Sequence, residues 1–266
     1  MSQKEPPPGK PRAPADAPEK PAGPSVLRAM VRSGLATGAW LVLAGALVSA
    51  LLAIAHPDSP LPDEWNPTRP LQIAAPVTPL TSWKLNRTAA DPALCMAALG
   101  EAATVAAMTP LTETDQCGIA DRVALSSVGT SRLDPVETRC ATALRLAMWE
   151  RHSVQPAARA ILGTEVRRIA HIGSYNCRPM RTSAGTSARM STHATADAFD
   201  ISGFTFADGG QVTLLGDWDD GTAKGRFLRA VRDGACDWFG LTLSPDFNAL
   251  HADHFHLQTR GWGGCR

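Results

Sequence analysis

Four polar residues in the C-terminal part of the chain have the types and spacing of a metal site. His193 and Asp200 are seven positions apart, and His254 and His256 form an alternating pair further along. Imidazole nitrogens and carboxylate oxygens are the usual ligands of a catalytic zinc ion, which takes three protein ligands and leaves one position for water. We therefore expect these side chains to meet around a zinc ion.

The spacing of these residues requires a short strand and a turn. His254 and His256 lie in a strand-like run, so they should point to one face while Phe255 points into the core. His193 and Asp200 would lie on opposite faces of an unbroken strand, because their separation is an odd number. They converge if His193 lies on a loop that leads into the strand bearing Asp200. The alternative is that the histidine pair merely caps an element or lies on the surface.

Three stretches that could position this site are predicted to be helices. Residues 95–108 are rich in Ala, Leu and Met, which favour helix. Asp134-Pro135 should supply an N-cap and a first-turn proline for a helix over residues 136–151. Residues 222–239 carry apolar side chains at helical spacing.

Four short runs, each flanked by Gly, Asp, Ser or Pro, are predicted to be strands. Because the helices come mainly first and the strands mainly later, the pattern indicates an α+β fold with a small antiparallel sheet flanked by helices. This domain is expected to span residues 91–266. The predicted strands are 166–172, 198–202, 212–215 and 254–259.

A long uncharged segment precedes this domain. Residues 35–55 contain no charged side chain, and at about 1.5 Å per residue they span a hydrocarbon core of roughly 30 Å. Lys and Arg residues precede the segment and the next one is Arg69, so the positive-inside rule places the N-terminus in the cytoplasm. We therefore expect a single-pass anchor in the inner membrane and a periplasmic C-terminal domain. A cleaved signal peptide ending near Ala55 and a buried core helix are the alternatives.

Proline-rich segments flank the predicted anchor. Residues 1–34 are dominated by Pro, Ala, Lys and Glu, have little to bury, and are predicted to be a disordered cytoplasmic tail. Residues 56–90 also contain many prolines, which disfavour helix, and are predicted to be a linker or an extended wrap over the domain. Apolar side chains such as Trp65 and Leu85 suggest that this second segment packs onto something.

The cysteines agree with export. All six lie after the hydrophobic segment, and an even number in an oxidising compartment favours up to three disulfides. A structural zinc site is the alternative, but the chain contains no CxxC pair. Their pairing stays open, because spacing does not determine connectivity. The cysteines are Cys95, Cys117, Cys140, Cys177, Cys236 and Cys265.

The overall composition excludes two classes of protein. The chain is 44% hydrophobic and 19% charged, with a formal net charge of +1. No nucleic-acid partner is expected, because phosphate neutralisation needs a surplus of Lys and Arg on one face. A wholly disordered chain is excluded as well, since enough apolar side chain is present to build a core. Composition leaves the oligomeric state open.

The surroundings of the polar residues resemble known families. The pattern SxHxxxxAxD followed by HxH is similar to the zinc-binding pattern of the lysostaphin and D-Ala-D-Ala metallopeptidase group. Longer stretches such as WNPTRPL, GSYNCR, STHATADAFDISGF and LSPDFNALHADHFHL more closely resemble the bacterial extensin-like C-terminal family, and the matching stretches cover most of residues 62–266. The resemblance implies the D-Ala-D-Ala metallopeptidase or Hedgehog-like fold.

The resemblance to the metallopeptidase group also assigns roles by position. It implies that His193, Asp200 and His256 bind zinc, and that His254 acts as general base or stabilises the transition state. The expected activity is hydrolysis of a peptide bond in peptidoglycan stem peptides or cross-links, for which zinc would acidify a water molecule and polarise the carbonyl.

The same resemblance implies that Ser191, Tyr175 and Arg178 help to bind substrate. Arg178 would engage a substrate carboxylate in bidentate fashion, and a surface salt bridge is its alternative role. One position departs from the pattern, because Ala196 stands where relatives often have glycine. A loop geometry that depends on glycine is therefore expected to differ here.

Two other functions compete with the peptidase hypothesis. One is a non-catalytic cell-wall-binding or scaffold protein that retains the metal site. The other is an interaction module held by disulfides, in which the histidines bind no metal. Zinc content distinguishes the interaction module from the peptidase and the scaffold, because only the last two bind metal. Turnover then distinguishes the peptidase from the scaffold.

Overall fold

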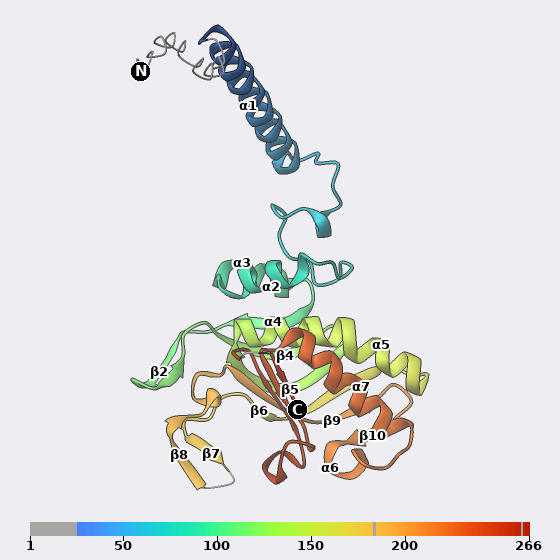
Figure 1. Cartoon of the computed structure of the whole chain (residues 1–266). Helices are drawn as coiled ribbons and strands as arrows, with labels where there is room; N and C mark the ends of the chain where they lie inside the picture. The colour runs from blue at the N-terminus through green and yellow to red at the C-terminus, as the bar shows by residue number, and fades with distance from the viewer. Residues whose placement is uncertain (1–25, 183–184, 262) are drawn as a thin grey trace, which may run out of the picture. The chain divides into compact units, whose positions relative to one another are not determined.

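The computed structural model describes residues 26–182, 185–261 and 263–266, and the chain divides into two units (Figure 1). The first unit, Met1–Pro60, contains helix α1, and the second, Leu61–Arg266, contains all other described elements. The prediction of disorder over residues 1–25 lies outside the described residues.

Helix α1 spans Val26–Ala55, and its stretch from Thr37 to Ala55 is long and apolar enough to cross a membrane. The predicted helix of membrane-spanning length is confirmed, but it begins at Val26 rather than Leu35, so the end of the predicted tail is helical. Five of the nine residues 26–34 are Leu, Arg, Ala or Met, and a helix that has already nucleated extends easily through such residues.

The segment predicted to be a linker belongs mostly to the compact unit, which begins at Leu61 rather than at residue 91. Leu71, Ile73 and Leu85 are buried in the core. Their burial favours the extended wrap over the free linker, because prolines prevent a long helix but allow an extended chain to pack onto the domain. The short helices of this segment are η1 (Asp63–Trp65) and α2 (Thr81–Ala89).

One mixed sheet of nine strands forms the centre of the compact unit (Figure 1). The strands are β1 (Ala103–Ala107), β4 (Arg122–Val128), β5 (Ser131–Arg139), β6 (Val166–Gly173), β9 (Ala198–Phe206), β10 (Gln211–Thr213), β11 (Leu241–Leu243), β12 (Phe255–Gln258) and β13 (Gly264–Cys265). Their order is β1-β4-β5-β6-β9-β12-β11-β13, with β10 paired to β9. The α+β class is confirmed. The sheet is larger than predicted, however, and it is not purely antiparallel, because the β5–β6 and β11–β13 pairs are parallel.

The strands predicted near the site are present. The predictions for 166–172, 198–202 and 254–259 correspond to β6, β9 and β12, and β9 continues to Phe206. The run 212–215 divides between β10 and a short helix, α6 (Leu214–Asp217), because the Thr213 side chain caps that helix by accepting from the Gly216 N–H.

The helix predicted over residues 95–108 is only half right. Helix α3 spans Pro92–Gly100, with the Asp91 side chain as its N-cap, and the chain then turns into β1. The Ala-rich composition favours helix throughout, but β1 pairs along its length with β4, and this pairing overrides the local preference.

The helix predicted over residues 136–151 begins later. Helix α4 spans Cys140–Trp149, and Asp134-Pro135 lies in β5 instead of forming a helix start. The β4–β5 register shifts around this dipeptide, so Pro135 occupies an irregular position where a strand tolerates proline. Two π-helical turns (Glu150–Val154 and Ala158–Leu162) and α5 (Gln155–Ala157) continue the path of α4.

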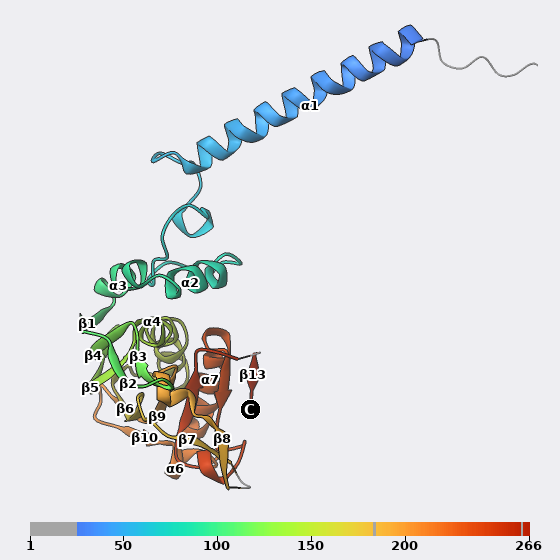
Figure 2. The ribbon, with the colours of Figure 1, turned by 90° about the vertical axis from the view of Figure 1, so that its left-hand side faces the viewer.

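The third predicted helix is confirmed as α7, which spans Ala223–Trp238 and is capped by the Thr222 side chain. Helices α4 and α7 lie side by side (Figure 2), joined by a 2.8 Å hydrogen bond from Trp149 Nε1 to the Val231 carbonyl. They enclose a core with the sheet, and its largest fully buried aromatic side chains are Trp149, Phe199, Phe204, Phe227 and Phe255.

Three disulfides connect the elements, as predicted. Cys95–Cys140 joins α3 to α4, and Cys236–Cys265 joins α7 to β13. Cys117–Cys177 joins a small hairpin to the loop that follows β6. This hairpin consists of β2 (Leu111–Thr114) and β3 (Cys117–Ile119), and a second small hairpin consists of β7 (Pro179–Thr182) and β8 (Gly185–Met190).

Candidate metal centre

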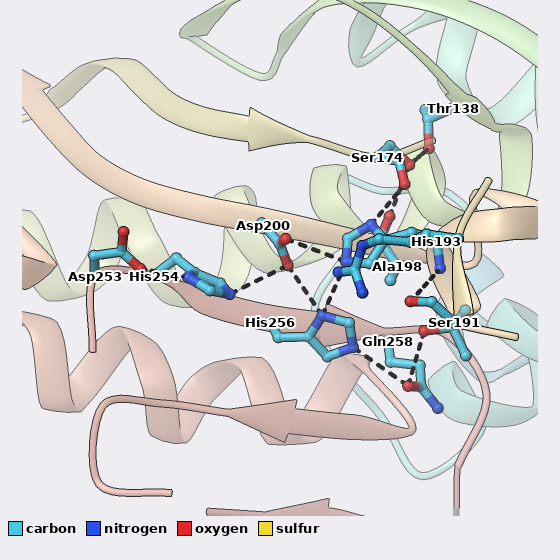
Figure 3. A network of polar contacts seen from close by, with 12 residues as sticks. Thr138, Ser174, Ser191, His193, Ala198, Asp200, Asp253, His254, His256 and Gln258 are labelled. Carbon is cyan, nitrogen blue, oxygen red and sulfur yellow. Dashed lines mark hydrogen bonds and ion pairs between the residues drawn. The ribbon is translucent and has the colours of Figure 1, made fainter. Parts of the chain in front are cut away.

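The structure brings the three predicted zinc ligands together (Figure 3). Asp200 in β9 is the register partner of His256 in β12, and His193 lies in a short helix, η4 (Thr192–Thr195), just before β9. The Asp200 carboxylate is 3.1 Å from His193 Nε2 and 3.0 Å from His256 Nδ1. The two nitrogens are 3.2 Å apart, and all three side chains are buried.

Backbone hydrogen bonds within η4 and the turn after it reverse the chain between His193 and Asp200. Ser191 is the N-cap of η4, and its Oγ accepts from the His193 N–H at 3.3 Å. The Ala196 N–H donates to the His193 carbonyl oxygen at 3.1 Å. His193 therefore lies on a loop that leads into the strand bearing Asp200, which is the arrangement that their odd spacing requires.

Ala196 has left-handed backbone angles, φ 50° and ψ 27°. It is the one non-glycine with a positive φ in the part of the chain that the structure describes. Glycine adopts this conformation freely, whereas an L-residue loses about 1 kcal/mol or more there. The turn thus keeps a geometry that favours glycine, and Ala196 adopts it at an energetic cost.

Hydrogen bonds on the outer side of each imidazole define its tautomer. His193 Nδ1 is 2.7 Å from the Ser174 carbonyl oxygen, which can only accept, so Nδ1 carries the hydrogen and Nε2 keeps a lone pair. His256 Nε2 is 3.4 Å from Gln258 Oε1, and the Gln258 amide nitrogen donates to the Arg260 carbonyl oxygen. This orientation of Gln258 gives His256 a hydrogen on Nε2 and a lone pair on Nδ1.

The atoms that face each other are therefore all electron donors. Two imidazole lone pairs and a carboxylate converge within 4.8 Å, an arrangement that is repulsive unless a cation lies among them. Two nitrogens and one carboxylate are a common ligand set for zinc, and outer hydrogen bonds of this kind orient ligating imidazoles. The residues present thus fit a metal ion held by His193 Nε2, Asp200 and His256 Nδ1.

Asp200 has the charge state that a metal ligand needs. Its burial raises the pKa of the carboxyl group, but hydrogen bonds and charge interactions with His193 and His256 in their protonated forms lower it more, so that the pKa lies well below its ordinary range, and a bound cation would act in the same direction. The carboxylate is therefore ionised at neutral pH, as ligation requires.

His254 lies beside the three ligands, immediately before β12 (Figure 3). Its Nε2 is 3.8 Å from Asp200 Oδ1, and its Nδ1 is 2.7 Å from Asp253 Oδ1. Phe255 and Leu257 are fully buried, so the predicted alternation of polar and core residues holds along this run. Asp253 itself is more than half exposed.

Two partners of the predicted ligands, Gln258 and the Ser174 carbonyl, were not predicted from the sequence, whereas Asp253 lies where it can orient His254, a role that its position before the histidine pair suggests. Gln258 lies two positions after His256, and the period of two along a strand could have identified it. The Ser174 carbonyl belongs to the backbone, so no residue type could have revealed it.

Comparison with protein families places this geometry in context. Residues 93–266 match the family model described as extensin-like protein C-terminus. The chain belongs to the extensin-like C-terminal family. The match includes every residue of the candidate metal centre, and it confirms the resemblance found in the sequence. Comparison with curated proteins and with solved structures finds no match, so the similarity of this extensin-like domain to zinc metallopeptidases stays a prediction.

Two of the three residues predicted to bind substrate lie in the loop between β6 and β7 of the extensin-like domain. The Tyr175 hydroxyl donates to Glu113 Oε2 at 2.6 Å, and burial together with this carboxylate raises the pKa of Tyr175 to about 12. Arg178 Nη1 donates to the Pro179 carbonyl oxygen at 3.3 Å. The third, Ser191, is buried and caps η4.

Backbone hydrogen bonds hold this loop against the metal centre. The Asn176 N–H donates to the His193 carbonyl oxygen, and the Ser191 N–H donates to the Arg178 carbonyl oxygen, both at 3.0 Å. The loop of Tyr175 and Arg178 thus adjoins η4. Among the described residues, no hydrogen bond joins the side chain of Tyr175, Arg178 or Ser191 to that of a predicted ligand.

A buried ion-pair network supports the start of β9. Asp197 is 2% exposed, and its carboxylate lies 2.7 Å from Arg139 Nη1 and 2.9 Å from Arg260 Nη2. The Thr195 hydroxyl donates to it at 2.6 Å, and Arg139 also pairs with Asp121 at 2.6 Å. The network joins the end of η4 to β5 and to the segment after β12, so it fixes the positions from which two ligands project.

His251 packs beside the metal centre of the extensin-like domain. Its ring centroid is 5.2 Å from that of His254 and 5.8 Å from that of His256, and its Nδ1 is 2.8 Å from Asn248 Oδ1. Burial, followed by the charges of His256 and His254, lowers the pKa of His251 to about 4. An uncharged ring therefore forms one wall beside the ligands at neutral pH.

Proposed function

We propose that this extensin-like domain is a zinc-dependent peptidase, exported behind a membrane anchor, that acts on peptidoglycan stem peptides or cross-links. The single observation that carries the proposal is the convergence of His193 Nε2, Asp200 and His256 Nδ1 with their lone pairs facing inward. The peptidoglycan target is supported by the resemblance to wall-acting metallopeptidases and by the cysteines and the hydrophobic helix, which are typical of an exported protein.

Zinc is the metal that this ligand set favours. Histidine nitrogens with one carboxylate are typical of catalytic zinc sites that keep an open position. A zinc ion bound there would polarise a scissile carbonyl and would lower the pKa of a water to about 7. Burial of the three ligands excludes bulk water from one side of the site and strengthens these electrostatic effects.

His254 and Asp253 form a proton-accepting pair at the edge of this site. The Asp253 carboxylate accepts from His254 Nδ1, so that His254 Nε2 is left with a lone pair on the side of Asp200. A nitrogen placed there can take a proton from an attacking water and return it to the leaving amine. Asp253 orients the ring and would stabilise the imidazolium that forms when His254 takes the proton.

Substrate contacts would come from the loop that adjoins η4. Arg178 presents a guanidinium that can pair with a peptide carboxylate in bidentate fashion. Tyr175 is held by Glu113, and its phenol remains protonated well above neutral pH, so it can donate a hydrogen bond to a substrate oxygen if the loop rearranges.

A turnover assay with the zinc-loaded full-length chain and muropeptides tests the proposal. We expect new amino termini to appear, and His254→Gln to lower the rate roughly 100-fold or more while zinc remains bound, because general base catalysis contributes on that scale. Asp253→Asn should also lower the rate, because the imidazolium of His254 loses its neighbouring negative charge. His56→Ala, which lies outside the compact unit, is the matched control and should leave the rate unchanged.

The contrary result is equally specific. If the folded, zinc-loaded wild-type chain releases no more product than His254→Gln does, the peptidase proposal fails. The chain would then be better described as a wall-binding protein that retains the metal centre.

A further inference from the structure

The segment between the anchor and the family domain exposes an unusual amount of apolar surface. Leu61, Trp65, Val77 and Trp83 are 37%, 49%, 55% and 47% exposed. We call these four side chains the tryptophan patch. Large apolar groups left exposed in one short segment of an otherwise well-packed unit indicate that this segment contacts a partner or a membrane.

Two hydrogen bonds join the stretches of chain that carry these residues. The Thr78 hydroxyl donates to the Glu64 carbonyl oxygen at 3.1 Å, which places the residue after Val77 beside the residue before Trp65. Lys84 Nζ donates to the Asp63 carbonyl oxygen, which places the residue after Trp83 beside η1. Stretches separated by 14 and by 21 positions in sequence are thus joined within this segment.

The patch faces outward because the same segment buries a different set of side chains. In α2 the buried residues are Thr81, Lys84, Leu85 and Thr88, so Trp83 lies on the opposite side of that helix. Leu71 and Ile73 in the extended part also belong to the core. The exposed tryptophans are therefore left over after the segment has packed onto the domain.

The chemistry of the patch suits the interface of a lipid bilayer. Tryptophan is enriched at the level of the lipid headgroups, where its ring is half in an apolar and half in a polar environment. The Arg87 guanidinium lies 5.6 Å from the centre of the Trp83 ring, so a cation that can pair with lipid phosphate accompanies the apolar surface.

The position of the patch along the chain points to the same partner. Helix α1 ends at Ala55 and the compact unit begins at Leu61, so five residues, 56–60, connect them. Fully extended, such a connection reaches about 20 Å. The predicted tether of residues 56–90 would have allowed the domain to move far from the membrane. The connection of five residues keeps the start of the compact unit close to the end of α1.

We infer that the tryptophan patch rests in the headgroup region of the membrane that α1 crosses. This inference rests on the membrane-anchored location that forms part of the proposed function. The patch and the short connection together hold the compact unit at the surface of the bilayer.

Residue-level oxidation of the full-length chain tests this without any substitution. The chain is compared in a lipid nanodisc, made from zwitterionic and anionic lipids, and in an amphipathic polymer that surrounds α1 without a bilayer. We expect Trp65 and Trp83 to be oxidised at least threefold more slowly in the nanodisc, while Leu215 and Phe247, which are exposed elsewhere, react equally in both. Equal rates for the tryptophans, or protection that depends on protein concentration, would overturn the inference, the latter because it indicates a second copy of the chain.

A release experiment separates the patch from the anchor. A protease site is inserted within residues 56–60, and the full-length chain is reconstituted into liposomes that contain no other protein. The amount of domain that floats with the lipid is measured before and after cleavage. Flotation before cleavage tests α1. After cleavage, we expect the wild-type domain to remain at least fivefold more lipid-associated than Trp65→Ser/Trp83→Ser, with Leu215→Ser/Leu250→Ser as the matched control that behaves as wild type.

Complete release of the cleaved wild-type domain would contradict the inference while leaving α1 intact as an anchor. Loss of flotation before cleavage would contradict the anchor itself. Neither result bears on metal binding or turnover, so the proposed peptidase activity stands or falls separately.

Discussion

At the scale of single residues, the metal centre depends on which imidazole nitrogen is free. His193 is fixed by the Ser174 carbonyl and His256 by the Gln258 side chain, and both contacts place the hydrogen of a neutral ring on its outer nitrogen. Ligand identity is thus only part of the site. Its affinity for metal also depends on the groups that hold each ring in one tautomer.

Gln258 offers a test of this point, since it touches His256 but not the metal position. Gln258→Leu should lower zinc affinity about 10–100-fold, because the outer hydrogen bond that orients a ligand is lost. Competition with a chelator of known affinity measures the change. Gln116→Leu, in the turn of the β2–β3 hairpin, is the control, and an equal loss in both variants would show that the effect is not local.

Ala196 offers a test of the turn that brings His193 to Asp200. Ala196→Gly should be tolerated, because glycine adopts a positive φ freely. Ala196→Val should destabilise the folded domain by about 2 kcal/mol or more, since a branched side chain strains the turn and overfills a buried position. Denaturant unfolding of the oxidised protein gives both values, and equal stability of the two variants would contradict the assignment.

At the scale of elements, the site is built where β9, β12, η4 and one loop meet. The loop is held by backbone hydrogen bonds to His193 and Ser191, and its Cys177 is tied to the β2–β3 hairpin through Cys117. The hairpin therefore braces the loop, and through it η4, although it contributes no ligand.

Removing this brace should weaken both the fold and the site. Cys117→Ser/Cys177→Ser is expected to cost about 2–4 kcal/mol of stability, as loss of a native disulfide commonly does, and also to lower zinc affinity. Cys236→Ser/Cys265→Ser removes a disulfide that does not touch the loop, so it should lower stability and leave zinc affinity unchanged in the folded protein. Calorimetry and zinc titration distinguish the two, and the same affinity in both variants would argue against the brace.

The contact between Tyr175 and Glu113 makes a prediction about pH. The chain has one tyrosine, so tyrosinate absorbance reports on this residue alone. Its midpoint should lie near 12 and should fall toward the ordinary value in Glu113→Gln. Because the folded pKa is raised, the contact stabilises the fold fully below about pH 10 and is lost as the pH rises through 12. An unshifted wild-type midpoint would show that the contact does not form.

The sequence predicted the strands at this junction and the convergence of three candidate ligands, but it did not predict the ion pairs and turns that support them. His193, Asp200 and His256 could be recognised because their residue types and spacing carry chemistry. Helix was predicted for all of residues 95–108, but the second part of this range is a strand. Alanine is compatible with either structure, and pairing with β4 makes this part a strand. The role of Asp197 could not be predicted, because its ion pairs come from Arg139 and Arg260, which are distant in sequence.

At the scale of the whole molecule, the chain combines a helix able to cross a membrane with a compact unit that begins only a few residues later. The prolines of residues 56–90 predicted a long tether, but the apolar residues among them pack onto the domain. Three disulfides lie within this unit, and they suit a domain that is exported and must remain folded outside the cytoplasm. The account as a whole depends on the presence of a metal in that domain.

Zinc content of the purified full-length chain, measured beside His193→Ala, His256→Ala and the control His56→Ala, decides whether the three residues hold a metal. About one zinc per chain is expected in the wild type and the control, and zinc should be lost in both ligand variants while their disulfides and fold persist. A correctly folded wild-type chain that binds no metal at all would contradict this expectation.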